Sequence, residues 1–210
     1  MGKTLDINLN NISSGTIREI SSSVEKGNVI LYPTDTIYGL GCDVFNENAV
    51  RKIFEIKGRA ETKPLLVLAH SISMIETLVE EISPLAKKLL KTFSGKPLTI
   101  IFPASKNIPA IVTANTNTIG IRIPNTDFCQ ELLRESNIPL VSTSANISGK
   151  EIPTSIAEIE KIFSSKVDLF INAGNLPPSL PSTIIDITSG TVEMIREGAI
   201  KKEEFSEFLD

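Results

Sequence analysis

Short apolar segments alternate with amphipathic helical segments along most of the chain, and this alternation restricts the fold more than any other feature. Apolar runs such as 28–32 and 65–69 have the length and composition of buried strands. The segments between such runs repeat apolar residues at helical spacing, for example Ile17, Ile20 and Val24. Alternation of this kind predicts an α/β sheet with helices packed around it.

The strand and helix boundaries follow from capping and turn residues. Further strands are expected over 98–102, 118–123, 139–141, 167–171, 183–187 and 192–195. Helices are expected to begin at Thr16, Asn46, Ser73, Ser83, Thr126 and near Thr154 or Ser155, with a short terminal helix over 201–209. A hairpin at 189–190, and the lack of a helix between 102 and 118, predict a mixed sheet that is not purely parallel. No repeat or linker divides the 210 residues, so we expect a single domain over 1–210.

The composition excludes several classes of protein. Hydrophobic residues make up 41% of the chain, which excludes wholesale disorder, and no apolar run approaches the ~20 residues that cross a bilayer. The start lacks an apolar signal region, and Cys42 and Cys129 are isolated, so we expect a cytoplasmic protein without membrane attachment. With one histidine, His70, the chain has no basis for a histidine-rich metal site.

Polar residues gather at four places where expected strands or helices end, which is where ligands bind in α/β sheets. The first is the segment 33–41, directly after the strand over 28–32. Thr34 and Thr36 offer hydroxyls there, and Gly39 and Gly41 permit close approach of the backbone. Taken alone, this segment is more typical of a turn with capping residues.

The second place holds the basic residues Lys57, Arg59 and Lys63, where a helix is expected to end. Two interpretations fit them. Cations there complement the negative end of the helix dipole. They also suit a triphosphate, because arginine binds phosphate oxygens in pairs while lysine acts as a point charge.

The third and fourth places follow later strands. The segment 142–149 (STSANISG) carries more hydroxyls than a turn requires, although it could satisfy its own backbone. Arg122 lies in the strand TIGIRI and faces away from the neighbouring isoleucines. It either lies exposed on an open face or, if that face lines a cleft, binds a carboxylate. Ser182 lies directly before the strand over 183–187, and Arg196 lies at the end of the hairpin.

These segments, in this order, resemble the YrdC-like family of L-threonylcarbamoyladenylate synthases, in its short single-domain form. The resemblance rests on six segments: YPTDTIYGLG, the K-x-R of residues 57–59 followed by KPLLVL, TIGIRIP, STSANISG, PSTIIDIT and IREGAI. It implies a twisted mixed sheet with surrounding helices and a large cationic cleft. It also implies condensation of L-threonine, bicarbonate and ATP to threonylcarbamoyl-adenylate and pyrophosphate, which a separate transferase complex uses to modify tRNA.

The resemblance also implies which residues carry the reaction. The family tetrad corresponds to Lys57, Arg59, Ser144 and Asn146. The threonine contacts correspond to Thr34, Thr36, Arg122 and Ser182, and the ATP contacts to the tetrad with Lys63, Thr118, Ser142 and Arg196. Many members carry a histidine where this chain has Leu68, so a histidine contact to threonine is not carried over.

The reaction brings a carbamate anion to the α-phosphorus of ATP, so we expect catalysis by positioning and positive charge. No carboxylate cluster is evident in the sequence, so Mg²⁺ is expected to arrive with ATP. Two alternatives stay open: a module that binds double-stranded RNA or tRNA without catalysis, and a carbamoyl-transfer domain. A net charge of −4, no Trp and only two Tyr argue against the RNA module.

Overall fold

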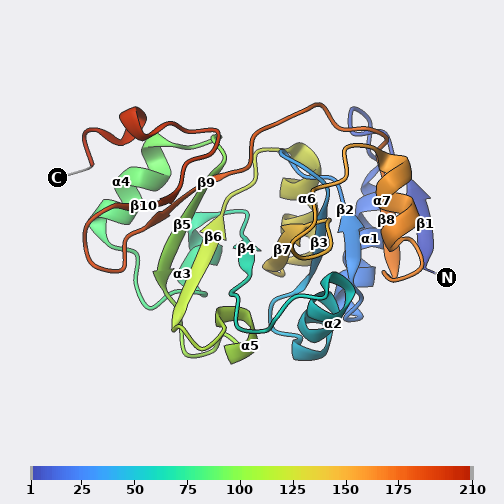
Figure 1. Ribbon diagram of the computed structural model, residues 1–210, viewed down its shortest axis with the longest axis horizontal. Coiled ribbons are helices and arrows are strands. Elements are labelled where there is room, and N and C mark those ends of the chain that lie inside the picture. Colours follow the sequence, from blue (N-terminus) through green and yellow to red (C-terminus); the bar gives the residue numbers. More distant parts are fainter. Residues whose placement is uncertain (1, 209–210) are drawn as a thin grey trace.

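The computed structural model describes residues 2–208, and its strands form a ten-stranded sheet flanked by helices (Figure 1). The sheet has the order β1-β8-β2-β3-β7-β4-β6-β5-β9-β10. The strands are β1 (Lys3–Asp6), β2 (Ile30–Tyr32), β3 (Gly39–Asp43), β4 (Leu66–Leu68), β5 (Leu98–Pro103), β6 (Thr118–Arg122), β7 (Leu140–Ser144), β8 (Leu169–Asn172), β9 (Thr183–Asp186) and β10 (Glu193–Arg196). The helices are α1 (Ser14–Glu25), α2 (Glu47–Lys57), α3 (Ile72–Glu76), α4 (Pro84–Thr92), α5 (Ala110–Thr113), α6 (Asp127–Ser136), α7 (Ile156–Phe163) and the 3₁₀ helix η1 (Lys202–Phe205).

The sheet is mixed, which confirms the prediction from the sequence. Strands β1 and β2 both pair in parallel with β8, as β4 does with β6 and β5 with β9. The other neighbours are antiparallel. The predicted hairpin joins β9 to β10, and Gly190 in its turn has φ = +88°, a conformation that favours glycine.

Four of the predicted helix caps are confirmed, and two are wrong. Side chains of Asn46, Ser83, Thr126 and Ser155 accept the capping hydrogen bonds of α2, α4, α6 and α7. Helix α1 is capped by Ser13 and not by Thr16, and α3 by Ser71 and not by Ser73. In both corrections a serine two or three residues upstream accepts from a backbone N–H of the first turn, so the helix starts earlier.

Four elements differ from the sequence-based expectation. Strands β1 and β3 and the short helix α5 were not predicted, and the terminal helix is the 3₁₀ turn η1; Leu209 lies outside the described residues. Strand β3 is hidden in the sequence because two of its five residues are glycines, which disfavour strands. Its pairing with β2 and β7 supplies the stability that its local sequence lacks.

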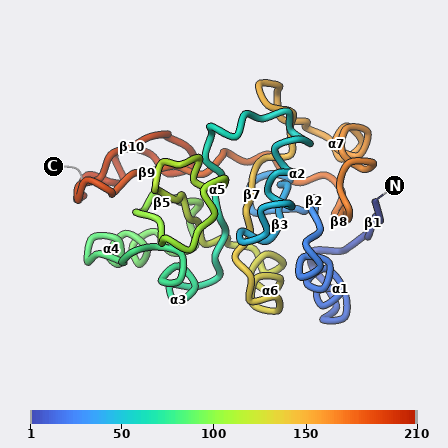
Figure 2. The backbone as a smooth tube through the Cα atoms, turned by 90° about the horizontal axis from the view of Figure 1, so that it is seen from below, coloured from blue at the N-terminus to red at the C-terminus, as the bar shows by residue number. Residues whose placement is uncertain are grey.

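Two apolar cores lie on the sheet. One lies beneath α1 and α6, which pack side by side, and includes Tyr32 and Phe128 (Figure 2). The larger core contains the buried apolar residues of α2, α3, α4 and α7. Along β6, Ile119 and Ile121 enter the larger core, so the alternate residue Arg122 faces the other side of the sheet. None of the helices within residues 2–208 has the length and apolar character needed to span a membrane.

Candidate active site

A cavity of about 520 Å³ opens over the strands β7, β4, β6, β5 and β9. Its walls come from the loop between β2 and β3, the segment after α2, and the ends of β9 and β10. Four basic side chains line it, namely Arg59, Lys63, Arg122 and Arg196, and the lining residues include no Asp or Glu. A large cationic cleft stays a prediction, which these four side chains support.

The structure brings most of the predicted site residues to this one cavity. Its lining includes Thr34, Thr36, Arg59, Lys63, Arg122, Ser142, Ser144, Ser182 and Arg196. Three predicted residues, Lys57, Asn146 and Thr118, are not among the described lining residues. Thr118 begins β6, where its hydroxyl lies 3.0 Å from that of Thr116.

Lys57 lies behind the cavity wall, where it holds the loop after β7. Its side chain is 1% exposed, and its ammonium group donates to the backbone carbonyls of Ser144 and Asn146 and to Asn146 Oδ1 at 3.2 Å. The Ser144 hydroxyl donates to the same Asn146 oxygen at 2.6 Å. Burial and the nearby Arg59 charge lower the pKa of Lys57 to about 8. Three of the four predicted tetrad residues therefore form one connected unit.

Gly58 turns the chain so that the fourth tetrad residue points elsewhere. It ends α2 with φ = +57°, a left-handed conformation that favours glycine. Arg59 consequently lines the cavity, where its Nη2 donates to the Pro64 carbonyl at 3.0 Å. Its Nε is buried and has no hydrogen-bond partner among the described residues. A buried N–H without a partner is costly, so this guanidinium suits an additional acceptor.

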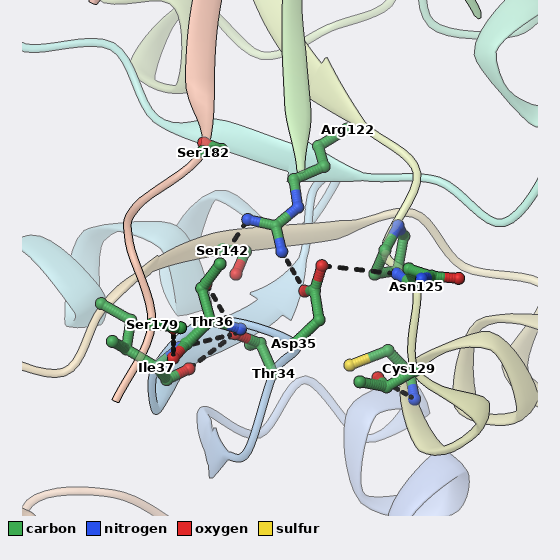
Figure 3. A network of polar contacts seen from close by, with 12 residues as sticks. Thr34, Asp35, Thr36, Ile37, Arg122, Asn125, Cys129, Ser142, Ser179 and Ser182 are labelled. Carbon is green, nitrogen blue, oxygen red and sulfur yellow. Dashed lines mark hydrogen bonds and ion pairs between the residues drawn. The ribbon is translucent and has the colours of Figure 1, made fainter. Parts of the chain in front are cut away.

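The two threonines of the loop between β2 and β3 have different surroundings (Figure 3). The Thr34 hydroxyl donates to the Ile37 carbonyl at 2.6 Å and accepts from the backbone N–H groups of Thr36 and Ile37. It therefore closes the turn, as the turn interpretation of this segment predicts. The Thr36 hydroxyl lies 3.5 Å from Arg122 Nη1 and faces the cavity.

Arg122 is buried and paired with a carboxylate of the protein itself. Its Nη2 forms an ion pair with Asp35, and both side chains are at least nine-tenths buried (Figure 3). Its Nε is buried without a hydrogen-bond partner among the described residues. The exposed alternative for Arg122 is therefore wrong, because Arg122 lies in the cavity wall with one donor unsatisfied.

Ser182 and Arg196 form a further polar group in the cavity wall. Arg196 donates from Nε and Nη2 to the Ser182 carbonyl, at 3.1 and 2.7 Å. The Ser182 hydroxyl lies 2.9 Å from the hydroxyl of Thr99 on β5. Burial, with the positive charge of Arg122, lowers the pKa of Arg196. Both arginines line the same cavity.

Sequence reasoning missed three residues that support the cavity from behind. These are Tyr32, which contacts Ser142, Asp35, which pairs with Arg122, and Thr99, which contacts Ser182. Tyr32 and Asp35 border or belong to the P-T-D-T segment, so their position was a usable signal. Thr99 lies 83 residues before Ser182, and only the pairing of β5 with β9 reveals it.

The cavity contains no histidine. Leu68 lines it, whereas His70 lines a separate cavity with Phe45, Met74 and Asn137. No three His, Cys, Asp or Glu side chains within residues 2–208 gather in a group that could hold a metal ion.

Comparisons with known proteins find relatives that match most of this chain. Residues 22–198 match a family model named Sua5/YciO/YrdC and described as "Telomere recombination". The threonylcarbamoyl-AMP synthase of Pyrococcus abyssi is 34% identical over 198 residues, covering 94% of this chain and 58% of that protein. A putative threonylcarbamoyl-AMP synthase of Methanocaldococcus jannaschii is 42% identical over 181 residues, covering 86% of this chain and 84% of that one.

A solved structure of a relative has the same fold as this chain. The crystal structure of P. abyssi Sua5 complexed with L-threonine has a TM-score of 0.92 and 33% identity, covering 98% of this chain and 60% of that one. This chain thus spans about three fifths of the Pyrococcus protein. The sequence match, the sheet and the shared identity together show that this chain belongs to the Sua5/YciO/YrdC family.

Proposed function

We propose that the chain condenses L-threonine, bicarbonate and ATP to threonylcarbamoyl-adenylate and pyrophosphate. The relatives named above are threonylcarbamoyl-AMP synthases, and one solved relative holds L-threonine. The observation that carries the proposal is the pair of arginines, Arg59 and Arg122, in one cavity. Each has a buried Nε without a described partner, so the cavity can receive two anionic groups.

The first anionic group is the threonine carboxylate, which we assign to Arg122. A guanidinium offers parallel donors that match the two oxygens of a carboxylate. Thr36 and Ser182 contribute hydroxyls on the same wall, and they suit the polar groups of a small amino acid. Asp35 is engaged by Arg122 and, at 3.5 Å, by the backbone N–H of Asn125, so we assign it to positioning Arg122.

The second anionic group is the triphosphate, which we assign to Arg59, Lys63 and Arg196. The carbamate formed from the threonine amine and bicarbonate attacks the α-phosphorus through an oxygen, and the bond to pyrophosphate breaks. Both reactants are anions, so fixed cations beside the departing pyrophosphate stabilise the developing charge. Ser144 offers a hydroxyl on the same wall. Lys57 and Asn146 act by holding the Ser144 loop in place.

Mg²⁺ would arrive with ATP rather than occupy a site of its own. The cavity lining offers hydroxyls but no carboxylate, which is the ligand that holds Mg²⁺ in protein sites. Phosphate oxygens and water would therefore supply most of its ligands. We further propose that the labile product passes to a separate transferase complex that modifies tRNA, and that the chain acts in the cytoplasm.

Incubation of the chain with ATP, Mg²⁺, bicarbonate and labelled threonine tests the proposal. We expect pyrophosphate and a threonine-containing adenylate, both dependent on bicarbonate. Valine should be a much poorer substrate, because a site that hydrogen-bonds a substrate hydroxyl rejects analogues without one. Arg59→Ala should abolish most of the turnover, while Arg51→Ala, an exposed α2 arginine paired with Glu61, should retain it.

Absence of pyrophosphate release by the wild-type chain would contradict the proposal. Salt-sensitive binding of double-stranded RNA without pyrophosphate release would favour the RNA-binding module instead. Equal turnover of valine and threonine would contradict the assignment of the cavity wall to threonine.

A further inference from the structure

Tyr32 carries a phenol hydroxyl that lies inside the protein. Its side chain is 0% exposed and packs in the apolar core beneath α1 and α6, with the Phe128 ring 6.5 Å away. The hydroxyl donates to Ser142 Oγ at 2.8 Å, and no other hydrogen bond of this hydroxyl is recorded within residues 2–208. Ser142 lines the cavity, so the phenol contacts the cavity wall from behind.

The path of Tyr32 across the sheet depends on one glycine. Tyr32 lies on β2, Ser142 lies on β7, and β3 separates the two strands. Gly41 on β3 pairs with Ser142, and a Cβ built on Gly41 would come within 2.7 Å of Tyr32 Cε1. Real Cβ atoms do not approach that closely, so Gly41 is the position that lets the ring pass over β3. Tyr32, Gly41 and Ser142 therefore form one spatial unit.

The Tyr32 hydroxyl keeps its proton and can therefore act as a hydrogen-bond donor. Burial raises the pKa of the Tyr32 hydroxyl well above its ordinary value, so it stays protonated. Because Ser142 Oγ accepts this proton, the proton of Ser142 itself is directed to another acceptor. Within residues 2–208 no acceptor for it is recorded, and the cavity lies on that side.

The surroundings of Ser142 indicate which ligand would accept that proton. Thr34, Thr36 and Arg122 line the same cavity. A Cβ built on Gly39 would lie 3.4 Å from Ser142 Oγ and 3.5 Å from Thr34 Cγ2, so Ser142 lies beside the loop between β2 and β3. In that loop the Thr36 hydroxyl lies 3.5 Å from Arg122 Nη1. Arg122 is the residue assigned above to the substrate carboxylate.

We propose that Tyr32 is a positioning residue for the amino-acid substrate: it fixes the Ser142 hydroxyl as a donor to the carboxylate that Arg122 binds. The proposal rests on the proposed function and assigns Ser142 to the amino acid, where the resemblance assigns it to ATP. The hydroxyl of Tyr32 is not needed to fill space, because phenylalanine has the same ring. The hydroxyl oxygen of Tyr32 acts instead by donating a hydrogen bond to Ser142.

A double-mutant cycle tests this with Tyr32→Phe, Ser142→Ala and the double variant, by calorimetric titration of threonine and of ATP separately. We expect Tyr32→Phe to weaken threonine binding about three- to tenfold, the effect of one net hydrogen bond, with ATP binding unchanged. The double variant should bind threonine no more weakly than Ser142→Ala, because the two hydroxyls act as one unit. Ser21→Ala, which removes a buried hydroxyl from α1, is the matched control and should bind threonine normally.

Three results would overturn the inference. They are normal threonine binding by Tyr32→Phe when Ser142→Ala is weakened, additive losses in the double variant, and weakened ATP binding in place of threonine binding. Thermal melting of each variant separates these results from misfolding. A wild-type chain that neither binds threonine nor releases pyrophosphate would refute the proposed function, whereas an active wild type without coupling refutes only the role of Tyr32.

Discussion

Two basic residues separated by a single glycine have opposite surroundings. The Lys57 ammonium is enclosed by three acceptors at the end of β7 and in the loop after it. Arg59, in contrast, lines the cavity with one N–H unsatisfied. Lys57 holds a loop and therefore contributes to stability. Arg59 faces the negative charge that develops on the departing pyrophosphate, and it therefore contributes to turnover. The K-x-R pattern therefore combines two functions that the sequence does not separate.

Alanine substitution separates these two functions. Arg59→Ala should lower turnover by on the order of 10², the scale for losing one preorganised donor, with little change in melting temperature. Lys57→Ala leaves buried carbonyls without donors, so it should lower both turnover and the free energy of unfolding, the latter by about 1–3 kcal/mol. Pyrophosphate release measured beside thermal melting checks both. Full activity in Arg59→Ala would return Arg59 to the role of a helix-end cation.

The pKa of Lys57 predicts a dependence of turnover on pH. Below about pH 8 the ammonium has a proton for each of its three acceptors. As the pH rises through that value one proton is lost, and with it one bond to the loop that carries Ser144. Turnover at saturating substrates should therefore fall above about pH 8. Lys88→Met, which removes an exposed lysine of α4, should keep the same profile, and a flat wild-type profile would contradict the prediction.

Arg122 should serve threonine more than ATP. Arg122→Lys keeps the charge and loses the planar pair of donors, and it also weakens the contact with Asp35. We expect threonine binding to weaken about 10-fold or more while ATP binding changes little, as measured by titration of each ligand separately. An equal loss of ATP affinity would mean that Arg122 binds phosphate.

At the scale of elements, the end of α2 decides how the cavity wall is built. Gly58 has φ = +57° and no atom lies within 4 Å of a Cβ built on it, so a side chain there meets strain but no clash. Gly58→Ala should lower the free energy of unfolding by about 1–2 kcal/mol, the cost of a left-handed non-glycine residue. Gly58→Asn should lose less, because asparagine tolerates this conformation. Chemical denaturation of both variants checks the order, and equal losses would contradict the conformational explanation.

At the scale of the whole molecule, one sheet connects the two halves of the chain. Strand β1 pairs with β8, and β9 near the C-terminal end pairs with β5 in the middle of the sequence. The larger core includes residues from α2 to η1. We therefore expect one cooperative thermal transition, with equal calorimetric and van't Hoff enthalpies. Two resolved transitions would show that the predicted single domain divides into separate folding units.

Local sequence determined most elements of this protein, and the reason is that their signals lie within a few residues. Helices α2, α4, α6 and α7 begin at their predicted caps. The apolar runs form strands because burial of their side chains in the sheet stabilises them. The four groups of polar residues could likewise be found, since each lies at or near the end of a strand or helix. Their gathering in one cavity was expected only from the resemblance.

Tertiary structure alone decided what each polar side chain does. Strand β3 forms because β2 and β7 pair with it, although its glycines disfavour a strand. Lys57 turns inward because the loop 87 residues later offers carbonyls there, and Arg122 meets Asp35 across a similar separation. Such partners are distant in sequence, and a hydrogen bond or ion pair depends on distances of a few ångströms. No local pattern encodes those distances, so the direction of each charge becomes known only once the strands have paired.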